Sequence, residues 1–249
     1  FRYPGAEEDV LHDISFTAEP GKTTAFIGST GCGKSTLVNL IPRFYDVTDG
    51  KITIDGKDIR NVSQHELREK LGYVPQKAVL FSGDIASNIL YGNPEGSEAE
   101  MTEAATIAQA TEFIEQKKKK YKSTISQGGS NVSGGQKQRL SIARAIAKHP
   151  DVYIFDDSFS ALDYKTDATL RAKLKEKTSE STVMIVAQRI STILHADQII
   201  VLDDGQIVGK GTHKELLKTC EAYYQIASSQ LSEKELEEDL KEVESYAKR

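Results

Sequence analysis

The sequence predicts an α/β fold: a core with a parallel sheet, a small antiparallel β subdomain and an inserted helical subdomain. Two observations predict the sheet. Short, continuous apolar runs are typical of strands buried on both faces, and segments with helical spacing separate these runs along the chain. The runs lie at residues 24–27, 152–155, 182–187 and 198–202. Because strands and helices alternate, we expect a parallel sheet with helices on both of its faces.

Composition limits the class of protein. The chain has 249 residues, enough for one large core or for one core with a subdomain. Its 38% hydrophobic and 28% charged residues are ordinary for a soluble globular protein. The net charge of −5 provides no basic field, which argues against a nucleic-acid partner. Cys32 and Cys220 form no metal-spaced pair, and they favour a reducing, cytosolic compartment.

Signals for the membrane or for secretion are not found in the sequence. No apolar run approaches the roughly 18 residues of a membrane span, and there is no signal peptide. The chain begins at Phe1, without an initiator methionine and partway through a predicted strand. We therefore expect a piece of a longer protein, whose missing part lies upstream.

The N-terminal segments lead to a glycine-rich loop. Residues 1–5 are predicted to be the aromatic end of a strand, followed by a turn. Residues 10–18 alternate apolar with polar side chains, which predicts a half-buried strand. Pro20–Gly21 then turns the chain into the apolar run at residues 24–27. The residues that follow this run are Gly28, Ser29, Thr30, Gly31, Cys32, Gly33, Lys34, Ser35 and Thr36.

This stretch fits the pattern G-x-x-x-x-G-K-[ST], and helical spacing continues from Thr36 to Ile41. A strand, a glycine loop and a helix start place several backbone N–H groups around one point, where the helix dipole also favours phosphate oxygens. We expect Lys34 to reach the β- and γ-phosphates and the hydroxyl of Ser35 to bind Mg²⁺. The sequence therefore predicts a site for a nucleoside triphosphate.

The middle of the chain predicts the two smaller subdomains. Asp49–Gly50 forms a tight turn, and alternation over residues 51–59 predicts a hairpin in a small antiparallel sheet. A short strand follows at residues 71–76, and residues 84–119 then show helical, alanine-rich spacing. We place the inserted helical subdomain at about residues 77–140.

Two adjacent carboxylates follow the next buried strand. A second glycine- and serine-rich loop at residues 126–136 leads into an amphipathic helix predicted at 137–148, and the strand at 152–155 then ends in Asp156 and Asp157. A phosphate-binding loop needs a carboxylate at the end of a neighbouring strand to hold Mg²⁺, and Asp156 is the candidate. Asp157 is the candidate for orienting and polarising the water that attacks the γ-phosphate.

The last residues differ in composition from the rest of the chain. Residues 232–249 are highly charged and carry only a thin apolar stripe. We expect a marginal, mostly exposed helix or a frayed tail there. Residues 1–231 are therefore predicted to form the nucleotide-binding domain itself.

These motifs together resemble a known family. The segment Val132-Ser-Gly-Gly-Gln136 is one conservative change from the signature loop of ATP-binding-cassette (ABC) proteins. With the phosphate-binding loop, Gln76, Asp156 and residues 160–163 in the same order and spacing, the resemblance covers nearly the whole chain and implies the ABC ATPase fold. It is similar in particular to the nucleotide-binding domain of ABC exporters, with supporting segments at residues 43–46, 54–56, 72–76 and 80–83.

The resemblance implies a role for several residues near the nucleotide. Tyr3 matches the aromatic residue that stacks on adenine. Gln76 matches the glutamine that contacts Mg²⁺ or the attacking water and senses the transmembrane domain. The implied cofactors are ATP and Mg²⁺, with Ser35, Gln76 and Asp156 as the expected metal ligands.

The resemblance also implies partners. In the family, the signature loop completes the ATP site of a second nucleotide-binding domain in a head-to-tail dimer, and another loop crosses the same interface. The matching residues are Ser133, Gly134, Gly135 and Gln136 in the signature loop and Asp163 in the crossing loop. The other implied partners are the transmembrane domains of an exporter, which would hold this chain at the cytoplasmic face of the cell membrane.

Three departures from the family pattern concern function. The water-polarising residue is a glutamate in the family and Asp157 here, which is one methylene shorter. A misplacement of about 1 Å at a catalytic group can lower the rate on the order of 10²-fold. The switch histidine is replaced by Gln188, which can hydrogen-bond a γ-phosphate but carries no positive charge. Gln127 and Gly128 replace a glutamate and an arginine, which weakens an expected electrostatic contact to the transmembrane domain.

Because Asp157 and Gln188 would lie on either side of one γ-phosphate, we expect a site that binds ATP but hydrolyses it slowly, with Gln76 as a third catalytic residue. The resulting hypothesis is the degenerate half of a heterodimeric, multidrug-type ABC exporter, whose signature loop completes the competent site of a hetero-partner. The alternatives are an active homodimeric exporter and an ATP-dependent regulatory dimerisation module without turnover. A soluble ABC ATPase of DNA repair is disfavoured by the acidic balance and by the lack of long coiled-coil insertions.

Overall fold

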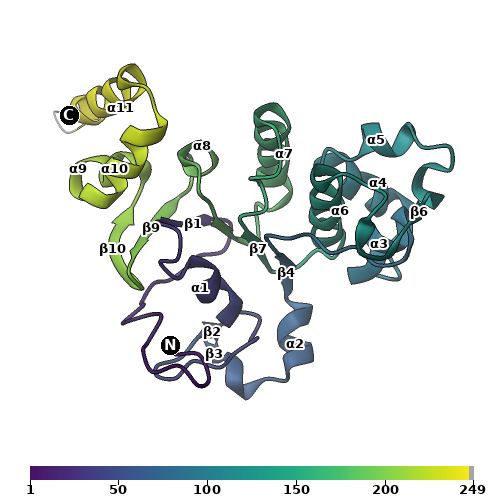
Figure 1. Cartoon of the computed structure of the whole chain (residues 1–249), viewed down its shortest axis with the longest axis horizontal. Coiled ribbons are helices and arrows are strands. Elements are labelled where there is room, and N and C mark those ends of the chain that lie inside the picture. The colour runs from purple at the N-terminus through teal and green to yellow at the C-terminus, as the bar shows by residue number, and fades with distance from the viewer. Residues whose placement is uncertain (247–249) are drawn as a thin grey trace. The chain divides into compact units, whose positions relative to one another are not determined.

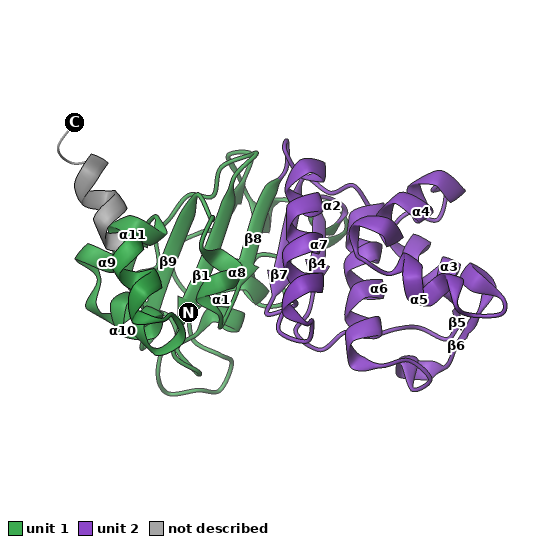
Figure 2. Cartoon of the chain, turned by 90° about the horizontal axis from the view of Figure 1, so that it is seen from above, with its two compact units in different colours: residues 1–68, 182–249 green, residues 69–181 purple. Residues whose placement is uncertain are grey.

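The structure is a computed structural model that describes the backbone of residues 1–246 and the side chains of residues 1–239. Its residues form two compact units (Figure 2). The first unit combines residues 1–68 with residues 182–249, and the second unit consists of residues 69–181. The first unit is therefore built from both ends of the chain.

The first unit contains neighbouring strands in the order β10 (Gln206–Gly211), β9 (Gln198–Asp203), β1 (Thr23–Gly28) and β8 (Thr182–Val186). β1 runs parallel to β8 and β9, and these parallel strands are largely buried, as their continuous apolar runs predict. β10 pairs antiparallel with β9 and is absent from the prediction. The Asp204–Gly205 dipeptide between them is a hairpin signal that could have revealed it.

The helices of the first unit cover its strands and extend its C-terminal end. α1 (Lys34–Leu40) follows β1 across the glycine loop. The hairpin of β2 (Thr53–Ile54) and β3 (Lys57–Asp58) forms the small antiparallel sheet that the sequence predicts. The other helices are η1 (Ile59–Asn61), α2 (Gln64–Glu69), which reaches the second unit, α8 (Ile190–Ile193), α9 (His213–Thr219), α10 (Glu221–Gln230) and α11 (Glu233–Tyr246).

The C-terminal helices pack on one another, and α9 and α10 lie beside β10 (Figure 1). His213 of α9 is buried, and its two ring nitrogens lie 2.7 Å from the hydroxyl of Tyr223 and 3.1 Å from a carboxylate oxygen of Asp239. Leu236 of α11 is also buried, so this helix is attached through both an apolar and a polar contact. The end of the predicted charged segment, residues 247–249, lies outside the described residues.

The second unit pairs β4 (Leu71–Val74) in parallel with β7 (Val152–Asp156), whose residues are all buried. A short antiparallel pair, β5 (Gly83–Asp84) and β6 (Thr124–Ile125), lies in the helical part of the unit. Its helices are α3 (Ile85–Ile89), η2 (Leu90–Gly92), α4 (Glu98–Ile107), α5 (Thr111–Glu115), η3 (Lys120–Lys122), η4 (Gln127–Gly129), α6 (Gly134–Ala147) and α7 (Tyr164–Lys177).

Residues 10–18 do not form the strand that their alternating pattern predicts. Burial does alternate along the segment, since Ile14 and Phe16 are half-buried whereas Asp13, Ser15 and Thr17 are exposed. However, Asp13 adopts a φ of 50°, a left-handed conformation that interrupts an extended strand. The prediction is therefore wrong: the side chains alternate, but the backbone does not join a sheet.

Candidate functional site

The loop at residues 28–36 connects β1 to α1 in the first unit. A Cβ atom on Gly28 would lie 2.0 Å from the carbonyl oxygen of Leu202, so a larger residue does not fit there. Gly33 has a φ of 99° at the N-cap of α1, a conformation that favours glycine. The first N–H groups of a helix have no partner within the helix, and this tight loop therefore directs those of α1 toward one place. The geometry suits a phosphate group.

Lys34 lies inside this loop. Its side chain is only 9% exposed, and Nζ donates to the carbonyl oxygens of Gly28 at 2.8 Å and Ser29 at 2.7 Å. The loop that would bind the phosphates therefore also orients the ammonium group. Ser35 and Thr36 follow in the first turn of α1, so the predicted Mg²⁺ ligand Ser35 starts from the same helix end.

An aromatic group adjoins the loop at the N-terminus of the chain. The hydroxyl of Tyr3 lies 2.9 Å from Oγ1 of Thr36, which connects the predicted adenine-stacking residue to the phosphate-binding loop. The ring of Tyr3 makes edge contacts with Phe1 at 4.9 Å and with Tyr45 at 5.1 Å between centroids. Tyr45 is absent from the predicted site, although it belongs to the segment at residues 43–46 that supports the family resemblance.

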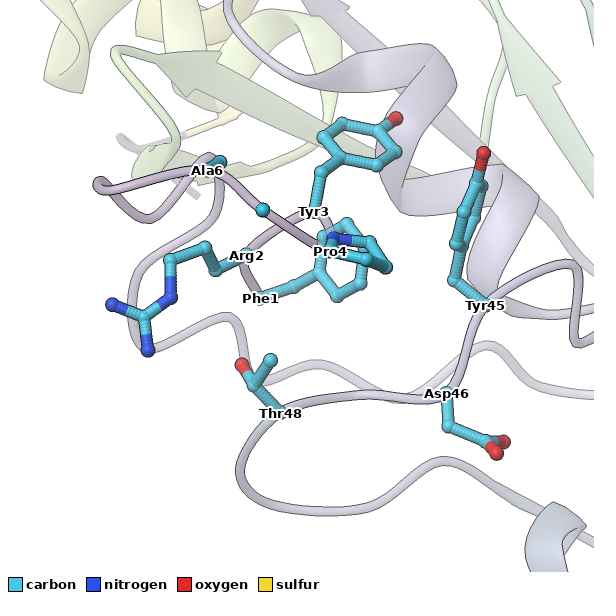
Figure 3. A pocket seen from close by; sticks show the side chains of 9 residues that line it. Phe1, Arg2, Tyr3, Pro4, Ala6, Tyr45, Asp46 and Thr48 are labelled. Carbon is cyan, nitrogen blue, oxygen red and sulfur yellow. The ribbon is translucent and has the colours of Figure 1, made fainter.

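These rings line an open cavity of about 640 Å³ (Figure 3). Its walls come from two segments of the first unit, namely Phe1, Arg2, Tyr3, Pro4, Gly5, Ala6, Tyr45, Asp46 and Thr48. Figure 3 shows the rings of Tyr3 and Tyr45 near each other at this cavity. An aromatic-lined cavity beside a phosphate-binding loop suits the base of a nucleotide, because every base offers a face for stacking.

Gln188 lies at the same end of the first unit's strands as the glycine loop. β1 and β8 are parallel, with Phe26 opposite Val186, and the N–H of Ala187 donates to the carbonyl of Phe26 at 3.0 Å. Gln188 therefore follows β8 where the glycine loop follows β1, and its side chain is exposed. Its backbone carbonyl accepts a hydrogen bond of 2.8 Å from Nε2 of Gln230, a residue that the sequence analysis does not single out.

The predicted catalytic carboxylates lie in the second unit, at the end of β7. Asp156 and Asp157 are 4% and 7% exposed. The hydroxyl of Tyr73 donates to Asp156 at 3.4 Å, and burial, reinforced by this carboxylate, raises the pKa of Tyr73. Nε2 of Gln76 donates to Oδ2 of Asp157 at 3.1 Å. Parallel pairing of β4 with β7 brings the ends of the two strands together, so two predicted catalytic residues meet directly.

Asp157 also has an unusual backbone conformation. Its φ is 46°, in the left-handed region that residues other than glycine rarely adopt. The carbonyl of Asp157 accepts a 2.9 Å hydrogen bond from the hydroxyl of Ser160, which supports the turn. Such a conformation at a candidate catalytic residue is a common feature of functional sites.

The signature loop forms the N-terminus of α6 in the second unit. Ser133 is the N-cap: its Oγ accepts from the N–H of Gln136 at 3.2 Å, and Oε1 of Gln136 accepts from the N–H of Ser133 at 3.1 Å. Ser133 and Gly134 are exposed, and Gly135 is half-buried. Because α6 begins at Gly134, its first N–H groups lie at an accessible helix end that favours an anion.

Asp163, predicted to cross a dimer interface, caps α7. Its two carboxylate oxygens accept from the N–H and the hydroxyl of Thr166, at 3.0 and 2.6 Å. These hydrogen bonds, the one from the hydroxyl first, lower the pKa of Asp163. This capping role is absent from the prediction, although an aspartate directly before a helix start is a capping signal.

The predicted site residues thus divide between the units. The first unit contains Tyr3, the loop at 28–36 and Gln188, and the second unit contains Gln76, Asp156, Asp157, the loop at 133–136 and Asp163. The first set offers backbone N–H groups, an ammonium group and aromatic rings, which suit a nucleotide. The second set offers buried carboxylates, which suit Mg²⁺ and the orientation of water.

Comparison with known proteins decides the family. A family profile described as ABC transporter matches residues 11–160. The chain belongs to the ABC transporter family. Its α/β fold is that of the ABC ATPase domain, which binds ATP, as the motifs predict.

Several ABC relatives are similar over nearly the whole chain. An uncharacterized ABC transporter ATP-binding protein of Mycobacterium tuberculosis is 50% identical over 233 residues, which cover 92% of this chain and 40% of that protein. A Staphylococcus aureus protein named for multidrug export, an ATP-binding/permease protein, is 44% identical over 230 residues, with the same coverage of 92% and 40%. The chain therefore spans less than half the length of these relatives.

A solved ABC structure gives the same fold. The structure of a bacterial Atm1-family ABC exporter with ATP bound superposes with a TM-score of 0.90 at 39% sequence identity, covering 94% of this chain and 41% of that one. Among the helices that the structure describes, none combines the length and the apolar character needed to cross a membrane.

Proposed function

We propose that this chain is the ATP-binding domain of an ABC exporter, that it dimerises with a second nucleotide-binding domain, and that its own ATP site turns over slowly. The Staphylococcus relative named for multidrug export and the Atm1-family exporter structure support the export role. One observation carries the proposal of slow turnover: Asp157 and Gln188 occupy the positions at which the family pattern has glutamate and histidine.

ATP binding would rest on the first unit. The N–H groups of the loop at 28–36 and the ammonium group of Lys34 would hold the phosphates, and the aromatic cavity around Tyr3 would receive adenine. The hydroxyl of Ser35 and the carboxylate of Asp156 have the oxygen donors that Mg²⁺ prefers. The bound ion would neutralise charge on the β- and γ-phosphates.

Hydrolysis would depend on residues that hold the attacking water. The carboxylate of Asp157 is already oriented by the amide of Gln76, at 3.1 Å, but its side chain is one methylene shorter than a glutamate. Gln188 offers a neutral amide in place of a charged imidazole, so its hydrogen bond to a γ-phosphate lacks the charge-assisted part. Both substitutions reduce the stabilisation of the transition state more than they reduce the affinity for ATP. The site would therefore hold ATP for longer.

The signature loop supports a role for this chain in a partner's site. Ser133 and Gly134 are exposed at the start of α6, and the side chain of Ser133 already satisfies the N–H of Gln136. The N–H groups at this helix end are suited to the γ-phosphate of a nucleotide bound by another domain. A hetero-partner with glutamate and histidine at its own positions would then form one competent site.

An aromatic patch in the second unit supports docking on the membrane part of the exporter. The rings of Phe81 and Tyr91 stack at 4.3 Å and are 42% and 61% exposed, and Val79 beside them is 53% exposed. The guanidinium of Arg144 lies against both rings and donates to the carbonyl of Val79 at 3.0 Å. Exposed apolar groups that gather in one patch indicate a protein contact, and the relatives are more than twice as long as this chain.

The test is Mg²⁺-dependent ATP turnover of the purified chain at high concentration, measured together with ATP binding and dimerisation. The variants are Asp157→Glu, Gln188→His and the double change. We expect the wild-type chain to bind Mg-ATP and to turn over slowly, and the double variant to be faster by about 10- to 100-fold, because each change restores a group at the γ-phosphate.

Wild-type turnover equal to that of the double variant would overturn the slow-site proposal and favour an active homodimeric exporter. If the double variant dimerises with ATP but also fails to hydrolyse it, a regulatory dimerisation module becomes the better interpretation.

A further inference from the structure

The side chain of Gln230 connects the last residue of α10 to the loop that carries Gln188. Its Nε2 donates to the backbone carbonyl of Gln188 at 2.8 Å, and its Oε1 accepts from the backbone N–H of Ile190 at 2.8 Å. One carboxamide therefore pairs with backbone groups on both sides of Arg189. This pairing restrains the backbone where the chain leaves β8 and enters α8.

The backbone groups involved need such a partner. Ile190 is the first residue of α8, and the N-cap residue Arg189 supplies no side-chain hydrogen bond to the helix. A helix start without a cap leaves N–H groups without an intrahelical acceptor. Gln230 therefore supplies from another helix the acceptor that a capping residue normally supplies, and it fixes the carbonyl of Gln188 at the same time.

Gln230 is itself well placed to hold this loop still. Tyr223, Ala227 and Gln230 follow helical i, i+4, i+7 spacing, so they lie along one side of α10. Tyr223 and Ala227 are fully buried, and the hydroxyl of Tyr223 lies 2.7 Å from Nδ1 of His213. The packed side of α10 thus directs the side chain of Gln230, which is exposed at the end of the helix, toward the loop.

We propose that Gln230 is a positioning residue for nucleotide recognition: it holds the backbone of Gln188 so that the Gln188 amide reaches the γ-phosphate. The inference rests on the proposed function, because the γ-phosphate contact of Gln188 belongs to that proposal. It adds a role for the C-terminal helices, which would help the chain to distinguish ATP from ADP. ADP lacks the γ-phosphate, so the effect of Gln230 belongs to ATP alone.

The experiment is calorimetric titration of the 249-residue chain with Mg-ATP and, separately, with Mg-ADP. The variants are Gln230→Ala, Gln188→Ala and their double change. Gln230→Glu is a second test, because it keeps an acceptor for Ile190 but places a carboxylate against the carbonyl of Gln188. Gln225→Ala is the matched control: Gln225 lies on the same helix, and its amide bonds Glu221 at 3.0 Å.

We expect Gln230→Ala and Gln230→Glu to weaken ATP binding by about 3- to 10-fold and ADP binding by less than about 2-fold, as for the loss of one or two hydrogen bonds. The double variant should bind ATP no more weakly than the single variant with the lower affinity, because both residues act on one contact. Gln225→Ala should leave both affinities unchanged. Thermal unfolding of each variant checks that the domain is folded.

Two results separate this inference from the proposed function. If Gln188→Ala weakens ATP binding selectively but the Gln230 variants affect ATP and ADP equally, or neither, the positioning role is wrong and the γ-phosphate role of Gln188 stands. If Gln188→Ala does not distinguish ATP from ADP, the γ-phosphate role of Gln188 is wrong, and this inference falls with it.

Discussion

Lys34 and Asp157 are buried charged residues of the candidate site, one in each unit, and they are held in place in different ways. Their exposed fractions are similar, 9% and 7%. Lys34 donates to the carbonyls of Gly28 and Ser29, six and five residues earlier in its own loop. Asp157 accepts from Gln76, which lies 81 residues earlier, after a different strand.

This difference separates affinity from turnover. A side chain oriented by its own loop keeps its position as long as the short motif is intact. A side chain oriented by a distant residue depends on strand register and on the length of both side chains, so one methylene changes its reach. We infer that Lys34 contributes to nucleotide affinity through a local motif, whereas Asp157 contributes to turnover through an assembled contact.

The largest effect is expected at Lys34, the residue that is held by its own loop. Lys34→Ala removes the only side-chain cation of the predicted phosphate-binding motif, and we expect Mg-ATP affinity to fall on the order of 100-fold, as for loss of a charge-assisted contact. Lys22→Ala, at an exposed residue paired with Glu19, is the control and should leave affinity unchanged. Calorimetric titration measures both. Retained affinity in Lys34→Ala would contradict this role of the lysine, because the backbone N–H groups alone would then suffice.

A smaller effect is expected at the aromatic cavity. Tyr3→Ala should weaken the binding of ATP and of ADP to the same extent, by about 10-fold, because base stacking does not involve the γ-phosphate. Tyr3→Phe keeps the ring and loses the 2.9 Å hydrogen bond to Thr36, so it should lower nucleotide affinity by less than about 3-fold. Tyr164→Ala, at an exposed tyrosine of α7, is the control. Weakened ATP binding with unchanged ADP binding would place Tyr3 elsewhere than at the base.

The smallest effect concerns the capping role of Asp163, and it depends on pH. Its folded-state pKa is lowered by the hydrogen bonds from Thr166, so its carboxylate stabilises the fold above the unfolded pKa of about 4. This contribution is lost as the pH falls through the lower, folded-state value. Asp163→Ala should therefore lower the melting temperature slightly near neutral pH, and the difference from wild type should shrink in acid.

Asp163→Asn keeps a good N-cap and removes the titrating group, so it should melt close to wild type near neutral pH. Thermal unfolding followed by circular dichroism measures all three chains. If Asp163→Ala left the melting temperature unchanged but lowered turnover, the contact with Thr166 would be secondary, and the predicted role at a dimer interface would gain support.

The sequence was sufficient for the elements that depend on local pattern. The continuous apolar runs predict the strands β1, β7, β8 and β9, and the structure confirms them. The alternation at residues 10–18 fails as evidence for a strand, because alternate burial also arises in an irregular segment whose backbone joins no sheet. β10 is missed, although the Asp204–Gly205 turn precedes it.

Local sequence is enough to predict the phosphate-binding loop, because its shape follows from adjacent residues: glycines that adopt positive φ angles, and a lysine that bonds its own loop. Which distant groups meet depends on the tertiary structure. The contact of Gln76 with Asp157 needs the pairing of β4 with β7, and the contact of Gln230 with the Gln188 loop needs the packing of α10. No local pattern encodes such contacts, since they depend on register and packing over tens of residues.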